Sequence, residues 1–204
     1  MRKNSARCDY LIAITGASGS IYAHRLIEEL LIQGKRLGLI FTRAAQQVFA
    51  YELQLPNNTN WAELISSRYD SQRVIVYDNE CLFAAPASGS RTAKAMIVVP
   101  TSMGTLSRIA GGNSANLLER AADVYIKEKR PLLLVPRETP LSAIHLENML
   151  KLSRLGVRII PAMPGFYQKP QTMIDLVDFV VGKILEGLEL EHSLYPSWEE
   201  QGAV

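Results

Sequence analysis

The sequence predicts a single-domain α/β protein with a doubly wound parallel sheet. Five apolar runs are continuously hydrophobic and do not alternate with polar residues, which is typical of strands covered on both faces. Helical patterns lie between these runs, and this alternation predicts right-handed crossovers between parallel strands. A chain of 204 residues with 48% hydrophobic and 21% charged residues fits one domain with a well-filled core.

The predicted strands and helices alternate along the chain. Strands are predicted at residues 10–14, 36–41, 95–100, 131–136 and 157–161, with a weaker one at 73–77. Helices are predicted at residues 20–33, 44–53, 116–129, 141–155 and 172–188. Because proline cannot donate to a strand ladder, three of the strands are expected to end at Pro100, Pro136 and Pro161.

Two further segments are predicted to be loops. Residues 52–61 form a polar turn cluster, and residues 79–94 combine small residues with Leu82 and Phe83. Loops of this length in a compact domain are usually functional or disordered. We expect the segment 79–94 to cover a substrate, with a plain surface excursion as the alternative.

Composition and charge argue against several classes of protein. A net charge of +2 is too small to indicate a nucleic-acid partner. No apolar stretch approaches the roughly 18 residues that span a bilayer, and the segment after the basic N-terminus is too short for a signal peptide. We therefore expect a cytoplasmic protein without a membrane partner. Cys8 and Cys81 are far apart and the histidines are scattered, so no metal site is expected.

The segment TGASG, after the first predicted strand, resembles a nucleotide-binding turn. Gly16, Ser18 and Gly19 precede a helix whose free N–H groups could hold an anion or an electron-rich ring edge. The alternative is a tight connection in which Ser18 or Ser20 serves only as the N-cap. These residues alone do not decide between the two.

A nicotinamide-dependent dehydrogenase matches this turn poorly. The dinucleotide fingerprint requires a third glycine where this chain has Tyr22, and an acidic residue after the second strand where it has Thr42 and Arg43. A Tyr125-x-x-x-Lys129 spacing similar to the catalytic pair of short-chain dehydrogenases is present, but this spacing is common by chance on helices. NAD is therefore not the expected ligand.

Polar residues follow several of the predicted strands. Thr42, Thr101 and Ser102 stand at such positions, and Arg137 and Glu138 come directly after the apolar run LLLVP. Ligands of open parallel sheets bind beyond the carboxyl ends of the strands. We therefore expect hydroxyl groups, a cation and a carboxylate to converge at that edge.

The segment 117–138 is the most charged stretch next to an apolar strand. Arg120 and Lys127 are seven residues apart and share one helix face. Such cations could bind phosphates, and the carboxylate of Glu138 among them could transfer a proton. The alternative is a solvated helix with Glu–Lys pairs, which does not explain the charged pair after LLLVP.

A set of motifs spread over residues 10–190 indicates a known family. The segments TGASG, PASGS, ERAADV, KEKRPLLLVPRE, IHLENMLKLSRLG and PGFYQKPQ occur in that family's order and at its spacing. With this combination the chain resembles the UbiX family of flavin prenyltransferases, whose members have also been labelled phenylacrylic acid decarboxylases. The five residues TGASG alone are not specific.

The resemblance implies a fold, a cofactor and a reaction. The implied fold is a flavodoxin-like Rossmann three-layer sandwich that binds FMN, commonly as a homododecamer with active sites where subunits meet. The implied reaction joins the five-carbon unit of dimethylallyl monophosphate to reduced FMN, builds a fourth ring and releases phosphate without a metal. The product is then the cofactor of a partner decarboxylase of the UbiD type.

The resemblance also implies roles for individual positions. Catalytic roles are implied for Ser18 at the central ring of the flavin, Glu52 at the active site, and Glu138 as the proton donor to the departing phosphate. FMN binding is implied for Gly16, Ala17, Ser18, Thr42, Ser102, Thr105, Arg120 and Arg137. Contacts with the prenyl substrate are implied for Ser88, Ser90, Lys127, Glu138, Tyr167 and Lys183.

Two positions depart from the family pattern. Lys183 replaces an arginine of some members, which keeps the charge but loses bidentate geometry. Leu82 falls near an aromatic residue that lines the prenyl site in some members. Both departures bear on prenyl binding more than on the reaction itself.

Two other functions compete with prenyl transfer. An FMN-dependent cysteine-type decarboxylase shares the fold, but its MNxxMW-type segment is replaced here by PASGSRTAKAM. A non-catalytic flavin carrier would leave Lys127, Glu138 and Tyr167 without a role. The prenyltransferase is therefore the favoured interpretation.

The chain is expected to divide into three segments. These are an N-terminal extension at residues 1–9, the FMN-binding domain at residues 10–190 and a C-terminal tail at residues 191–204. The last predicted helix is apolar on more than one side, which predicts burial against another subunit and hence a homo-oligomer.

Overall fold

Six parallel strands form one sheet in the order β3-β2-β1-β4-β5-β6. The computed structural model describes residues 8–55, 60–91 and 93–196, so parts of the predicted terminal segments, residues 1–7 and 197–204, lie outside it. The strands are β1 (Tyr10–Ile14), β2 (Leu37–Phe41), β3 (Val74–Tyr77), β4 (Ala95–Thr101), β5 (Leu132–Pro136) and β6 (Arg158–Ile159). The strand order reverses between β1 and β4, which is the topological switch point of a doubly wound sheet.

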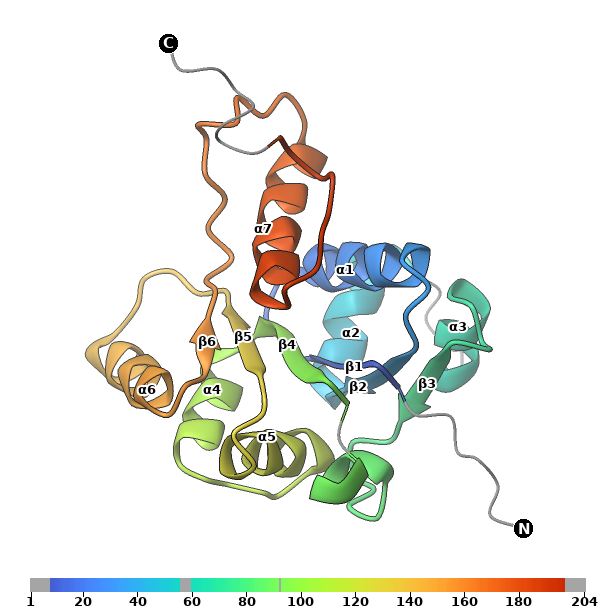
Figure 1. Ribbon diagram of the computed structural model, residues 1–204, viewed down its shortest axis with the longest axis vertical. Coiled ribbons are helices and arrows are strands. Elements are labelled where there is room, and N and C mark those ends of the chain that lie inside the picture. The colour runs from blue at the N-terminus through green and yellow to red at the C-terminus, as the bar shows by residue number, and fades with distance from the viewer. Residues whose placement is uncertain (1–7, 56–59, 92, 197–204) are drawn as a thin grey trace.

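Helices cover both faces of this sheet (Figure 1). One core cluster joins the strands to α1 (Ser20–Ile32), α2 (Arg43–Glu52), α3 (Trp61–Arg68) and α7 (Met173–Gly187). The other cluster joins them to α4 (Met103–Ala110), α5 (Leu117–Lys127) and α6 (Ala143–Arg154). The predicted three-layer doubly wound architecture is thus confirmed.

The continuous apolar runs form strands because both of their faces are covered. In β1, Tyr10, Ile12 and Ile14 pack into one core cluster, whereas Leu11 and Ala13 pack into the other. Every residue of β1, β2, β4 and β5 is buried. The edge strands β3 and β6 are only partly buried, which explains their weaker or shorter apolar pattern.

Two helices were not predicted from the sequence. Helix α3 has a single buried residue, Ile65, so its apolar periodicity is weak. Helix α4 is 8 residues long and contains Gly104 and Thr105, which are poor helix formers. Both helices begin with a side-chain cap, from Asn60 and Ser102 respectively. The capping residues were the available signal.

The prediction that β4 ends at Pro100 is wrong by one residue. The strand continues to Thr101, with a shift in its pairing with β5 between Val98 and Thr101. The Thr101 hydroxyl accepts the N–H of Val135 at 3.1 Å and donates to the Val98 carbonyl at 2.6 Å. A side chain therefore replaces ladder bonds at this irregularity, where proline is tolerated inside a sheet.

The segment 79–94 forms two short 3₁₀ turns, Ala85–Ala87 and Gly89–Arg91. It packs against the end of α5, since a Cβ atom at Gly89 would lie 2.9 Å from the Glu128 carboxylate. Leu82 is 44% exposed and Phe83 is fully exposed. Its predicted function as a cover over the substrate stays a prediction.

In the part of the chain described here, no helix has both the length and the apolar character needed to cross a membrane.

Candidate active site

The turn after β1 is tied directly to the end of β4 at the switch point. The Thr15 hydroxyl donates to the Pro100 carbonyl at 2.7 Å and accepts the N–H of Ser102 at 2.8 Å. Thr15 is 1% exposed, so both bonds are shielded from water. This buried pair of bonds holds the TGASG turn beside the start of α4.

Two glycines of the turn are required by its geometry. A Cβ atom at Gly16 would lie 2.6 Å from the Cβ of Ala44, so only glycine allows the turn to approach the start of α2. Gly19 has a φ of 113° and would place a Cβ 2.9 Å from the Tyr22 ring. A positive φ at the helix N-cap favours glycine strongly. The glycines thus bring the turn into contact with neighbouring helices.

The N-terminus of α1 is capped by a carboxylate of this chain. Glu52, the last residue of α2, accepts the N–H of Gly19 at 3.0 and 3.2 Å and the N–H of Ser20 at 2.7 Å. Helix α1 has no side-chain cap from its own N-cap residue. An anionic group therefore binds the free N–H groups, as expected of a helix N-terminus, and this group is the Glu52 carboxylate. Neither Ser18 nor Ser20 serves as the N-cap.

This environment lowers the pKa of Glu52. Partial burial acts in the opposite direction and raises it, but hydrogen bonds from the Ser18 side chain and from the Ser20 and Gly19 groups outweigh burial. Hydrogen bonds to a carboxylate favour its charged form. Ser18, itself exposed, is thereby connected to a carboxylate that stays ionised.

Glu52→Gln is expected to destabilise the protein by about 2 kcal/mol at neutral pH, because charge-assisted bonds to two N–H groups are lost. A carboxylate with a lowered pKa stabilises the fold above its ordinary value of 4.5, and this contribution disappears as the pH falls through the folded-state pKa. The difference between wild type and variant in urea unfolding should therefore shrink below pH 4.5.

The matched control for this prediction is Glu191→Gln, the same change at an exposed position after α7. It should change the free energy of unfolding by less than about 0.5 kcal/mol. A Glu52→Gln effect that is absent, or equally large at pH 3 and pH 7, contradicts the capping role.

Two predicted hydroxyl residues are N-caps at the same edge. Thr42 caps α2 by accepting the N–H of Ala45 at 3.1 Å. Ser102 caps α4 by accepting the N–H of Thr105 at 3.3 Å, and it donates to the Thr105 hydroxyl at 3.1 Å. Helices α1, α2 and α4 thus all begin at the carboxyl edge of the sheet, where their dipoles favour an anionic ligand.

The charged pair after β5 reaches the same turn. The Arg137 Nε donates to the carbonyl of Ser18 at 3.0 Å, which connects the end of β5 with the turn after β1. Glu138 is half-buried, and its Oε1 accepts the N–H of Thr139 at 3.0 Å. Arg137 therefore meets the glycine turn at the switch point, and Glu138 follows it at the carboxyl end of β5. The expected place of the Glu138 carboxylate in the site stays a prediction.

An ion pair behind this edge, between the exposed Arg108 and the buried Glu119, was not predicted. Arg108 Nε donates to Glu119 Oε1 at 2.5 Å, and its Nη2 donates to the Thr105 hydroxyl at 3.2 Å. Glu119 is 1% exposed and also accepts the N–H of Ala115 at 3.1 Å. The pair orients Thr105 and, through it, Ser102. Ser102, Thr105 and Arg108 are spaced three residues apart, which places them on one face of a helix. This spacing would have indicated their contacts only if α4 had been predicted as a helix.

Arg120 lies in the first turn of α5, next to Glu119 in the chain. Asn79, which follows β3, accepts the N–H of Leu117 at 2.7 Å and that of Leu118 at 3.1 Å, and so holds the start of this helix. Arg120 itself pairs with Asp123 at 3.0 Å. Its predicted contact with FMN stays a prediction.

A second group of predicted residues lies at the other end of α5. Lys127 ends this helix and lies 3.8 Å from Glu128, the residue against which the turn with Ser88 and Ser90 packs. The hydroxyls of Ser88 and Ser90 are 3.0 Å apart. Strand β5 runs between Lys127 and Glu138 with a rise of about 3.3 Å per residue, so these two side chains belong to opposite edges of the sheet within one chain.

A third group lies on α7 and in the loop before it. The Tyr167 ring packs edge-on against Phe179, with 5.6 Å between ring centroids. Lys183 Nζ lies 5.7 Å from the Phe179 ring and 5.5 Å from the Tyr195 ring, and it pairs with Glu186 at 2.9 Å. Tyr167 and Lys183 thus share one aromatic neighbour, consistent with a common ligand.

Comparison with known proteins defines the class of protein. The model of the family described as Flavoprotein matches residues 2–185. Two relatives named flavin prenyltransferase UbiX come from Halalkalibacterium halodurans, at 51% identity over 94% of each chain, and from Pseudomonas aeruginosa, at 46% identity over 95% of each chain.

Solved structures give the same result. The chain is similar to AnUbiX (PadA1) in complex with FMN and dimethylallyl pyrophosphate, with a TM-score of 0.85, 35% identity and coverage of 94% and 97% of the two chains. It is also similar to a dodecameric FMN-dependent UbiX-like decarboxylase from Escherichia coli O157:H7, with a TM-score of 0.82, 38% identity and coverage of 93% and 98%. The chain therefore belongs to the flavoprotein family and, within it, to the UbiX flavin prenyltransferases.

Proposed function

We propose that this protein is a flavin prenyltransferase that joins the dimethylallyl unit of dimethylallyl monophosphate to reduced FMN. The observation that carries the proposal is the contact between Arg137 and the Ser18 carbonyl, which brings the end of β5 to the glycine turn at the switch point. Its relatives are named for this activity, and one structural neighbour holds FMN together with dimethylallyl pyrophosphate.

The residues at the carboxyl edge suit FMN. Gly16 packs closely on Ala44 and has no side chain, so a flat ring can approach the backbone of the turn there. The hydroxyl caps Thr42 and Ser102 present polar groups beside it. Helix N-termini and Arg137 suit its phosphate. When bound and reduced, FMN supplies the electron-rich ring that accepts the allyl carbon.

The chemistry requires protein groups at the leaving phosphate. As the carbon–oxygen bond of the allyl phosphate breaks, negative charge develops on the phosphate, which nearby cations stabilise. A monophosphate leaves readily only when it is protonated, so Glu138 delivers the proton. We assign Lys127, Lys183 and Tyr167 to the phosphate, Ser88 and Ser90 to the covering loop, and Ser18 with Glu52 to proton transfer at the flavin.

The assigned phosphate ligands are divided between opposite edges of one chain, so we infer that the site is completed where subunits meet. Large apolar side chains are exposed on α6, with Ile144 66%, Leu146 52% and Leu150 51% exposed. Apolar surface of this kind indicates burial against another subunit. The dodecameric neighbour supports the same assembly here, and we propose a UbiD-type decarboxylase as the recipient of the product.

The function is tested by anaerobic incubation of the purified protein with reduced FMN and dimethylallyl monophosphate, followed by mass spectrometry of the released flavin. The expected product is a flavin heavier by one five-carbon prenyl unit. If FMN binds but its mass stays unchanged with both the monophosphate and the pyrophosphate, the proposal fails in favour of a flavin carrier or a decarboxylase.

A shared site predicts complementation between two inactive variants. Lys127→Ala and Glu138→Gln should each abolish most of the activity when present in every subunit. In mixed oligomers of the two variants, some sites combine an intact Lys127 from one chain with an intact Glu138 from another. Up to about a quarter of the wild-type activity should then return, by analogy with random assembly of two subunit types in a symmetric oligomer.

The control for this experiment is a mixture of Arg137→Ala and Glu138→Gln chains. These neighbouring residues act from the same chain, and every chain in the mixture carries one of the two substitutions. Every site therefore has one defect, and no activity should return. Recovery in this mixture that equals recovery in the first one contradicts a site divided between chains.

A further inference from the structure

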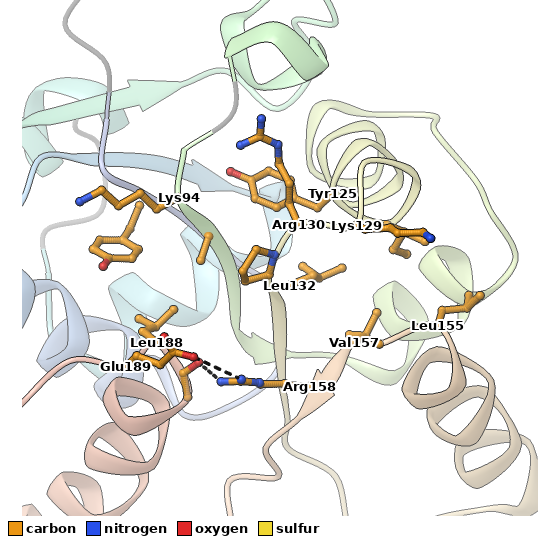
Figure 2. Close-up of a pocket in the computed structure, with 16 residues that line it drawn as sticks. Lys94, Tyr125, Lys129, Arg130, Leu132, Leu155, Val157, Arg158, Leu188 and Glu189 are labelled. Atoms are coloured by element: carbon orange, nitrogen blue, oxygen red, sulfur yellow. Dashed lines mark hydrogen bonds and ion pairs between the residues drawn. The ribbon is translucent and has the colours of Figure 1, made fainter.

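A cavity of about 590 Å³ lies at the amino edge of the sheet, opposite the glycine turn and the switch point. Its walls come from the starts of β1, β4, β5 and β6 and from the ends of α5, α6 and α7 (Figure 2). None of the predicted site residues lines it. A volume of this size is typical of small-molecule sites.

The floor of the cavity is apolar and buried. Tyr10, Ala95, Leu132 and Val157 line it and are each at most 5% exposed. The Tyr125 hydroxyl is already satisfied, because it donates to the Ala93 carbonyl at 3.1 Å. The floor therefore offers apolar contact and no hydrogen-bonding group from Tyr125.

The rim of the cavity is cationic. Lys94, Lys129, Arg130 and Arg158 line it, against one carboxylate, Glu189. Arg158 is held in place because it donates to the Gly187 carbonyl and lies 3.9 Å from Glu189 (Figure 2). Among the residues that the structure describes, the other three cations form no ion pair.

The negative ends of the helix dipoles offset only part of this positive charge. Three helices end at the cavity, and each contributes a partial negative charge of about half a unit. Together with Glu189 these partial charges amount to less than the four cations. A positive excess therefore remains above an apolar floor.

The backbone at two of the helix ends is unusual. Lys129 follows α5 with a φ of 51°, and Glu189 follows α7 with a φ of 59°. Glycine is the ordinary residue at such a left-handed position, as Gly156 at the end of α6 shows with a φ of 87°. Lys129 thus occupies a position where glycine is less strained, and it contributes a charge to the rim.

We propose that this cavity binds a small organic anion, with an apolar body on the floor and a carboxylate, sulfonate or phosphate group at the cationic rim. None of the residues assigned to the active site lines this cavity, and the proposal does not depend on the proposed function.

The test is a fluorescence titration of the full-length protein with 8-anilinonaphthalene-1-sulfonate, an anion with an apolar body, both with and without saturating FMN. One saturable site per chain is expected, unaffected by FMN and weakened by salt. The double variant Lys129→Gln with Arg130→Gln should bind at least 10-fold more weakly. Octyl phosphate should displace the dye, whereas inorganic phosphate and octanol at the same concentration should not.

The matched control removes the same charge from the exposed face of α6, with Lys151→Gln and Arg154→Gln, and should change dye affinity less than 2-fold. A single Lys129→Gly variant should keep its thermal midpoint within about 3 °C and still lose affinity, which separates binding from capping. Absence of saturable binding, competition by FMN, or equal losses in both double variants overturns the proposal. Equal displacement by inorganic phosphate overturns the role of the apolar floor.

Discussion

Glu138→Gln is expected to lower the rate of prenyl transfer by about 10²- to 10⁴-fold, because glutamine has no acidic proton to give to the departing phosphate. The glutamine amide oxygen can still accept the N–H of Thr139, the contact that Glu138 makes at 3.0 Å. The local structure should therefore be kept. The measurement is the single-turnover rate of prenylated flavin formation with both substrates saturating.

FMN affinity separates a proton-transfer role from a structural one. It should change less than about 3-fold in Glu138→Gln, whereas Arg137→Ala should weaken FMN binding clearly, because a charge-assisted contact is lost. Prenyl transfer by Glu138→Gln at a near wild-type rate contradicts the proposed proton donor. Loss of FMN binding in this variant assigns Glu138 to the cofactor instead.

Glu119→Ala is expected to destabilise the fold by about 3 kcal/mol, the largest effect on stability that we predict. Glu119 is 1% exposed and holds both Arg108 and the N–H of Ala115, so its removal leaves the guanidinium and a backbone donor without their partner. Removing one partner of a buried ion pair costs about 3–5 kcal/mol. We expect the lower value because Arg108 is 47% exposed and water can partly solvate it. Urea unfolding at pH 7 measures the loss.

The double variant Arg108→Leu with Glu119→Leu tests whether the loss comes from an unpaired charge. Replacing both partners by apolar residues removes the uncompensated group, so this variant should be more stable than Glu119→Ala. FMN binding should nevertheless weaken in the double variant, because Thr105 loses the bond that Arg108 donates at 3.2 Å. Equal stability of the two variants contradicts the importance of pairing.

The layered architecture could be predicted because continuous apolar runs have few structural interpretations. Runs such as LIAI and LLLVP are buried on both sides in the structure, and each predicted helix has a counterpart within a few residues. Helices α3 and α4 escaped prediction because one has a single buried residue and the other is short. Their stability comes from caps and tertiary packing, which apolar periodicity does not report.

The site was predictable in part for a different reason. The carboxyl ends of parallel strands share one edge, so Thr42, Ser102 and Arg137 could be placed together from their positions after the strands. The cap of α1 could not be placed in this way, because Glu52 lies 33 residues from Gly19 and reaches it only through the packing of α2. The resemblance to UbiX proteins implied an active-site role for Glu52, but it did not indicate which groups Glu52 contacts.

The sequence by itself determined the class of fold, the edge of the sheet that carries the polar residues, and the family. The fold class and the polar edge follow from local patterns of apolar and polar residues, and the family follows from motifs in the sequence. Only the tertiary structure decided that Glu52 caps α1, that Arg108 pairs with the buried Glu119 behind Thr105, and that Lys127 lies across the sheet from Glu138. Such contacts join residues far apart in the chain, and their distances are set by packing and not by spacing in the sequence.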